Sequence, residues 1–295
     1  MTTIDHTAYP TIMDKIIAHA SMQALFKLRL TSTSFRARVD AQVGTHALLS
    51  TDRMLGVKNE GSDRNKLRTY LLKKHRFSPG PTSWALNTPP STARVVDIHD
   101  ALLDMPDPSP VLRGFPSVST VRRLWLGDPS PQMMDLVSPH STVVDFITLP
   151  LSQTFEGIYL STGNRHIIHL RVGDTTITSH LKVLGSTDSV TIVLWRHSAT
   201  VGKELSMSTK LRLLDILLTI LSQSPLHFTV AGLQHVVETD DYGHIVDNVK
   251  RIHSMNPDSD TEMKILTINE WWEELEAGEK EVIGMWPSEY DDMKV

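Results

Sequence analysis

The sequence predicts a mixed α/β protein, in which a small module of three helices precedes an irregular, repeat-like α/β domain. Three observations support this prediction. The first 50 residues carry apolar side chains at helical spacing, short β-rich runs recur from residue 94 onward, and helical patterns separate the last of those runs. Strands that alternate with helices are typical of a parallel sheet. We divide the chain into a helical module (residues 1–50), a connector (residues 51–92) and an α/β domain (residues 93–295).

The first predicted helix follows Tyr9 and Pro10. Thr11 is positioned to cap this helix, with Asp14 three residues later, which is close to the spacing of a capping box. The apolar residues of the helix form a single stripe at helical period. They are Ile12, Met13, Ile16, Ile17 and Ala20.

Two further short helices are predicted, with Ser21 and Ser32 as their caps. Their apolar residues are Leu25, Leu28 and Leu30 in the second helix, and Phe35, Val39 and Val43 in the third. Helices this short are not stable in isolation, so all three must pack on one another or on a partner.

The connector is polar and basic. We expect a basic helix over residues 64–77, followed by proline-rich breaks at residues 78–81 and 89–90. Its basic side chains predict either a solvated helix face or a contact with nucleic acid, an acidic partner or a phosphorylated peptide. The candidates for a partner contact are Arg64, Arg68, Lys73 and Lys74.

From residue 94 onward, short runs of β-branched and aromatic residues predict strands. Two helical patterns lie between the later runs. Residues 205–221 are apolar nearly all round, so we expect this helix to be buried, and residues 242–252 form a weaker pattern. The predicted strands are residues 94–99, 121–126, 143–149, 166–172, 190–195, 227–231 and 263–268.

The spacing of the first five runs, about 24 residues, lies within the range of leucine-rich repeats. Residues 121–128 are similar to the strand part of such a repeat, whereas the other runs do not keep its consensus. We therefore predict an irregular, leucine-rich-repeat-like α/β domain. The alternative is a doubly wound parallel sheet.

The order and spacing of residues 9–49 form a recognisable pattern. Residues 9–17 place an apolar residue and a proline before a helix with paired aliphatics, and residues 28–36 combine an arginine, small hydroxyl residues and an aromatic. In these features the segment resembles an F-box. Tyr9 replaces the leucine and Phe35 the tryptophan that are usual in the family, and both keep apolar bulk.

The resemblance implies that these helices bind a Skp-type adaptor, and through it a cullin scaffold, so that the rest of the chain brings a target protein to a ubiquitin ligase. The protein would then be neither an enzyme nor dependent on a cofactor. A ligase-independent interaction scaffold is the alternative, and an α/β enzyme is a third hypothesis. The residues divided between internal packing and the adaptor interface would be Tyr9, Pro10, Ile12, Ile16, Ile17, Leu25, Leu28 and Phe35.

The C-terminal part also resembles a group of eukaryotic F-box proteins that end with a β-run, the pattern Glu-Trp-Trp-x-x-Leu and a Trp-Pro tail. In this chain the pattern covers residues 270–275. Trp271 and Trp272 would point about 100° apart on a helix. Either one of them is exposed as an anchor for a partner, or both are partly buried against the last strand.

Motifs for nucleotide binding and hydrolysis are absent from the sequence. Gly202 and Lys203 lack the preceding glycine and the following hydroxyl residue of a phosphate loop, and no Gly-x-Gly-x-x-Gly, Gly-x-Ser-x-Gly or His-Glu-x-x-His is present. The chain has no cysteine, which excludes thiolate zinc sites and cysteine nucleophiles. His166 and His169 would lie on opposite faces of a strand, so we predict no metal site there.

Charge is distributed unevenly along the chain. Residues 1–90 contain 13 basic and 6 acidic residues, whereas 12 acidic residues and 3 lysines follow from Asp258 onward. An acidic C-terminal half argues against binding to a phosphate backbone, so we expect no nucleic-acid partner. With neither a secretory signal nor a membrane-spanning stretch in the sequence, we expect a soluble protein of the cytoplasm or nucleus.

Overall fold

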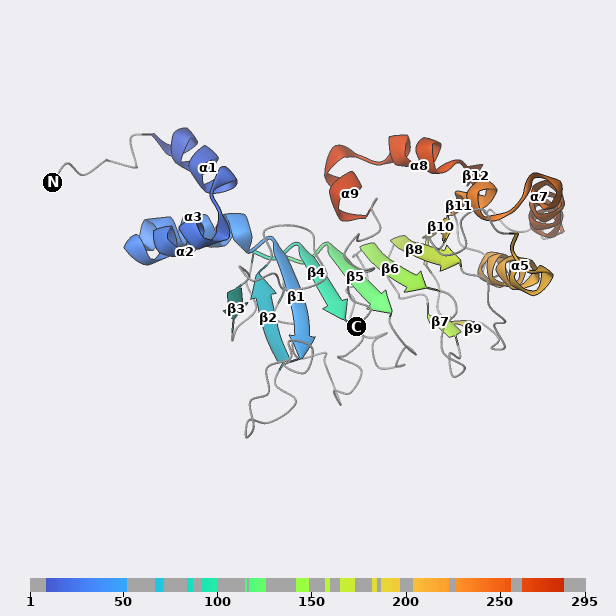
Figure 1. Ribbon diagram of the computed structural model, residues 1–295, viewed down its shortest axis with the longest axis horizontal. Helices are drawn as coiled ribbons and strands as arrows, with labels where there is room; N and C mark the ends of the chain where they lie inside the picture. Colours follow the sequence, from blue (N-terminus) through green and yellow to red (C-terminus); the bar gives the residue numbers. More distant parts are fainter. Residues whose placement is uncertain are drawn as a thin grey trace.

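The computed structural model describes residues 9–51, 67–71, 84–86, 92–99, 115, 117–125, 142–148, 157–159, 165–172, 182–184, 187–196, 204–222, 227–255 and 262–283. Three N-terminal helices lie beside one end of a long sheet, and the later helices lie at its other end and over its middle (Figure 1). The mixed α/β class predicted from the sequence is confirmed.

The N-terminal module consists of α1 (Pro10–His19), α2 (Met22–Thr31) and α3 (Thr33–Val43). The predicted caps of α2 and α3 are confirmed, because the Ser21 and Ser32 side chains accept hydrogen bonds from backbone N–H groups three residues later. The predicted cap of α1 is wrong. Proline lacks an N–H and has a helical φ, so α1 begins at Pro10 with Tyr9 as its uncapped N-cap, one residue before Thr11.

Among the described residues, ten strands form one sheet in the order β12-β11-β10-β8-β6-β5-β4-β1-β2-β3, and β7 and β9 form a separate pair. The strands are β1 (His46–Thr51), β2 (Leu67–Leu71), β3 (Trp84–Leu86), β4 (Val95–His99), β5 (Thr120–Trp125), β6 (Thr142–Thr148), β7 (Gly157–Tyr159), β8 (Arg165–Val172), β9 (Lys182–Leu184), β10 (Ser189–Arg196), β11 (His227–Ala231) and β12 (Glu262–Leu266). Within the sheet, β1, β4, β5, β6, β8, β10, β11 and β12 are parallel and follow one another in chain order.

This strand order decides between two predicted topologies. A doubly wound sheet reverses its strand order at a switch point. No such reversal occurs among the parallel strands, so the doubly wound alternative is wrong. Because crossovers between parallel strands are right-handed, a sheet in chain order carries all its connections on one face.

The helices after β10 follow this rule. We call the face covered by α5 (Met207–Leu221), α6 (Leu233–Val236) and α7 (Thr239–Ser254) the back face, and it forms the larger hydrophobic core. After β12 the chain returns over the opposite, front face as α8 (Ile268–Glu274) and α9 (Ala277–Val282). Figure 1 shows α8 and α9 (red) on the side of the sheet away from α5.

Each of the seven predicted strand runs overlaps an observed strand, and the two predicted helices correspond to α5 and α7. The last strand ends at Leu266, not at residue 268, because Thr267 caps α8. The expectation that residues 205–221 are buried all round is wrong in part. Met207 and Leu211 are exposed on α5, whose opposite side packs on the sheet.

The predicted basic helix over residues 64–77 is also wrong where the structure describes it. Residues 67–71 form β2, which pairs antiparallel with β1 because backbone pairing outweighs the local helical pattern. The sequence did not predict β1, β3, β7 or β9. Since β1 begins at His46, the helical module ends about five residues earlier than predicted. Within the described ranges, no helix is both long and apolar enough to cross a membrane.

Candidate functional site

The helical module has a small apolar core of its own. Ile17, Leu25 and Val39 are buried, one from each helix, and Ala20, Leu28 and Phe35 pack against them while remaining partly exposed. Four of the eight predicted adaptor contacts therefore contribute to internal packing. They are Ile17, Leu25, Leu28 and Phe35.

The other four predicted contacts face outward. Tyr9, Ile12 and Ile16 are 59%, 56% and 47% exposed, and Pro10 is exposed beside them. Spacings of three and four residues place Tyr9, Ile12 and Ile16 on one side of α1, and we call these three residues the α1 face. Burying an aliphatic side chain contributes about 1.5–3 kcal/mol of favourable free energy. Covering this face would therefore stabilise a complex.

A second exposed apolar pair lies on α2 and was not predicted as a contact. Phe26 and Leu30 are 46% and 60% exposed, and their spacing of four residues places them on one side of the helix. This spacing was visible in the sequence, but the sequence did not show which side of α2 faces the core.

Charged contacts hold the three helices together. Arg29 on α2 donates from Nε and Nη2 to Asp40 on α3, over 2.6 and 3.2 Å. Arg38 on α3 donates to the Asp14 carboxylate over 3.2 Å and to the Pro10 carbonyl over 3.3 Å. These bonds fix α1 and α2 against α3, so the α1 face is presented on a defined arrangement of helices.

The other predicted partner contacts receive less support. Trp271 is only 2% exposed and packs under α8 against the front face, so it is not available as a surface anchor. Trp272 is half-buried against the same cluster. Arg68 lies on β2, whereas Arg64, Lys73 and Lys74 lie outside the described residues.

The sheet interior contains two networks of buried charge. On the front face, Arg122 donates to both oxygens of Asp97 over 2.7 Å, and His46 Nε2 lies 2.9 Å from the same carboxylate. Burial raises the pKa of Asp97, but Arg122 and then His46 outweigh burial, so the pKa is lowered. Burial lowers the pKa of His46, an effect that Asp97 only partly offsets.

The back face carries a similar network. Arg123 donates to both oxygens of Asp145 over 2.6 Å, and His166 Nε2 lies 2.5 Å from Oδ2. Burial raises the pKa of Asp145, but Arg123 and then His166 outweigh burial and hold it below its ordinary value. For His166 burial dominates and lowers the pKa.

His169 is a third buried histidine and contacts the C-terminal helices. Its Nδ1 accepts a hydrogen bond from Trp195 Nε1 over 2.9 Å, so its Nε2 carries the proton and donates to the Ile283 carbonyl over 2.6 Å. Burial lowers the pKa of His169 to about 3, so the ring is neutral near pH 7.

These perturbed groups lie apart from the pocket described below. Each lies inside the sheet, and none of them lines the pocket found on the front face. Within the described part of the chain, no group of three or more histidine, cysteine or carboxylate side chains is arranged to hold a metal ion. We therefore assign the buried networks a structural role.

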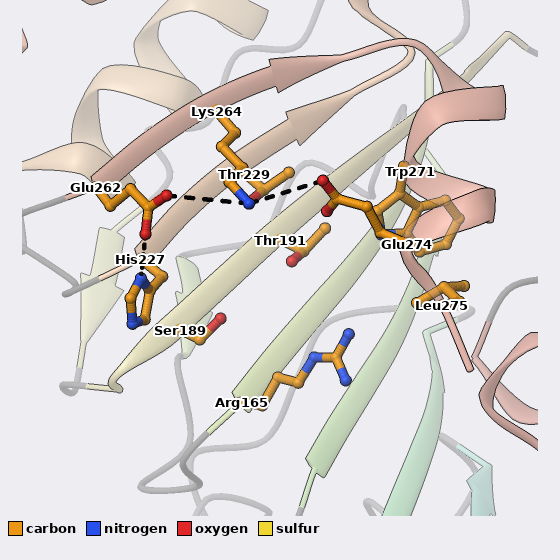
Figure 2. A pocket seen from close by; sticks show the side chains of 10 residues that line it. All are labelled: Arg165, Ser189, Thr191, His227, Thr229, Glu262, Lys264, Trp271, Glu274 and Leu275. Atoms are coloured by element: carbon orange, nitrogen blue, oxygen red, sulfur yellow. Dashed lines mark hydrogen bonds and ion pairs between the residues drawn. The ribbon is translucent and has the colours of Figure 1, made fainter.

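The pocket lies under α8, at the amino-terminal ends of β8, β10, β11 and β12 (Figure 2). This pocket was not predicted from the sequence. The signal was present, because polar and apolar residues alternate at the start of β10, β11 and β12, which leaves one face polar. The lining residues are Arg165, Ser189, Thr191, His227, Thr229, Glu262, Lys264, Trp271, Glu274 and Leu275.

Comparison of the chain with known protein families, curated proteins and solved structures finds no match.

Proposed function

We propose that this protein is a substrate receptor of a Skp–cullin–F-box-type ubiquitin ligase. The N-terminal helices would bind a Skp-type adaptor, and the α/β domain would bind a target protein. The observation that carries the proposal is the α1 face: Tyr9, Ile12 and Ile16 are exposed apolar residues within the segment that resembles an F-box. The protein would promote ubiquitin transfer by holding the target near the ligase, without chemistry of its own.

The strand order supports a leucine-rich-repeat-like domain as the target-binding part. In such repeats, parallel strands follow one another in chain order, as β4, β5 and β6 do. The front face differs from an open repeat surface, since α8 and α9 cover part of it. We infer that a target would bind beyond these helices, toward the β1 end of the sheet.

The test is co-expression of the full chain with a Skp-type adaptor, followed by size-exclusion chromatography. We expect a one-to-one complex that is lost in the double variant Ile12→Glu/Ile16→Glu. Because both side chains are exposed, the variant should keep its helices, which circular dichroism would verify. The matched control is Lys250→Glu, which adds negative charge at an exposed position of α7 and should leave the complex intact.

Separate elution of a folded wild-type chain and the adaptor would refute the ligase proposal. The ligase-independent scaffold would then be the better hypothesis. A complex that survives Ile12→Glu/Ile16→Glu would show that the α1 face is not the adaptor surface.

A further inference from the structure

The pocket under α8 is built from two rows of side chains in register across four adjacent strands. Arg165, Ser189, His227 and Glu262 form the outer row, and Thr191, Thr229 and Lys264 form the inner row. Figure 2 shows Thr191 near the middle of the pocket, with Lys264 and Glu274 on one side and Arg165 on the other. The volume is about 250 Å³, which suits a ligand of roughly one amino acid in size.

Thr191 carries a polar group that the fold leaves unused. It is only 6% exposed, yet its hydroxyl has no hydrogen-bond partner among the described residues. Ser189 and Thr229 beside it also have hydroxyls without a partner in the part of the chain that the structure describes. Because polar groups in a protein interior are almost always hydrogen-bonded, hydroxyls that face a pocket without a protein partner are open to bond a ligand or water.

The cationic side chains add further unused donors. Lys264 Nζ lies 3.9 Å from Glu262 and 3.7 Å from Glu274, beyond hydrogen-bond length. Arg165 donates from Nη1 to Glu279, and no other bond to a described residue engages its guanidinium. Lys264 and Arg165 therefore present donors on the two sides of Thr191, which favours a ligand with acceptor oxygens.

The net charge limits what that ligand can be. Glu262, Glu274 and Glu279 carry three negative charges, against the two positive charges of Arg165 and Lys264. A polyanion would be repelled by three carboxylates so close to the two cations. A single carboxylate needs only a few directed donors, which the hydroxyls and cations supply.

We propose that this pocket binds the carboxylate of a molecule about the size of one amino acid. The Thr191 and Ser189 hydroxyls and Lys264 would donate to the carboxylate, with Arg165 on the opposite side. Two sources share this chemistry: a free amino or acylamino acid, and the C-terminal residue of a peptide. The site lies far along the chain from the α1 face, so its test does not depend on adaptor binding.

The probes are N-acetylalanine, alanine and trialanine, each compared with its C-terminal amide, in calorimetric titrations of the full chain. We expect saturable binding of acids, in the millimolar range or tighter, and at least tenfold weaker binding of the matching amides. Binding of trialanine would identify a peptide C-terminus as the occupant. Binding of alanine or N-acetylalanine without binding of trialanine would identify a small free acid as the occupant.

The decisive variant is Thr191→Val, which keeps the shape of the side chain and removes its hydroxyl. Loss of a hydrogen bond to a charged group should weaken acid binding about tenfold. The Tm should stay the same or rise, because the hydroxyl has no partner to lose. Thr209→Val is the matched control, since its buried hydroxyl is bonded to Ser206 over 2.9 Å. It should lower the Tm and leave binding unchanged.

Lys264→Gln should also weaken acid binding, whereas Lys250→Gln on exposed α7 should not. The proposal would be overturned by equal binding of acids and amides, by the absence of saturable binding, or by Thr191→Val with wild-type affinity.

Discussion

Arg122 and Arg123 are consecutive residues of β5, yet their guanidinium groups lie on opposite faces of the sheet and bind different strands. Arg122 pairs with Asp97 of β4 on the front face, and Arg123 pairs with Asp145 of β6 on the back face. Successive side chains of a strand alternate between faces, and each aspartate is the direct register partner of its arginine. Side chains as well as backbone therefore bind β5 to both of its neighbours.

This arrangement predicts a large effect of removing one partner. Asp145→Asn should lower the free energy of unfolding by about 3–5 kcal/mol, because it leaves Arg123 as an uncompensated buried charge. The double variant Arg123→Met/Asp145→Leu should recover more than half of that loss, since apolar residues replace the pair. Urea denaturation measures both. A double variant as unstable as Asp145→Asn would contradict this account.

The buried histidines predict that stability falls with decreasing pH. The unfolded chain protonates His169 near pH 6.5, whereas the folded protein does so only near its lowered pKa of about 3. Between these pH values the unfolded state binds more protons than the folded state. Through this residue, each decrease of one pH unit therefore lowers the free energy of unfolding by up to about 1.4 kcal/mol. His46 and His166, whose pKa values are also lowered, act in the same direction.

The variant His169→Gln tests this contribution. A glutamine side chain can donate to Ile283 and accept from Trp195 but does not titrate. Urea titrations at pH 7, 6 and 5 should show a shallower decline for this variant than for the wild type. His235→Gln, at an exposed position of α6, should keep the wild-type decline. Equal slopes for all three proteins would rule out His169 as a source of the pH dependence.

Substitution by alanine should have opposite effects on stability at two glycines of the chain. Gly232 has φ +81°, and a Cβ there would lie 2.7 Å from the Leu194 carbonyl oxygen and 2.8 Å from Ile268 Cγ1. Gly232→Ala should therefore destabilise the fold by about 1–3 kcal/mol. Gly243 lies in α7 with no atom within 4 Å of a Cβ, so Gly243→Ala should stabilise by about 0.5–1 kcal/mol. Thermal unfolding of both variants would check the signs.

Truncating an aliphatic side chain should affect stability differently in the core of the helical module and on its surface. Leu25 is fully buried, so Leu25→Ala should cost about 2–5 kcal/mol of stability. Ile12 is 56% exposed, so Ile12→Ala should change stability by no more than about 0.5 kcal/mol. The helical signal during urea unfolding would report both. A large loss in Ile12→Ala would mean that α1 packs differently.

The sequence predicted features that depend on near neighbours. Seven of the eight parallel strands described were predictable, because their runs of β-branched residues favour extended backbone. The caps at Ser21 and Ser32 were predictable because capping acts over three residues. The β2 segment was predicted as a helix from its local pattern. That prediction was wrong because pairing with β1, about twenty residues away, outweighs the local pattern.

Sequence alone thus identified the α/β class, most strands of the main sheet and a helical N-terminal module with a possible partner surface. The three-dimensional arrangement was needed to show that Ile12 faces solvent while Ile17 faces the core, and that Thr191 lies in a pocket with Lys264. Burial and charge pairing depend on residues that are distant along the chain. Their spacing in the sequence does not specify which of them meet, because folding sets those contacts through the order and register of the strands.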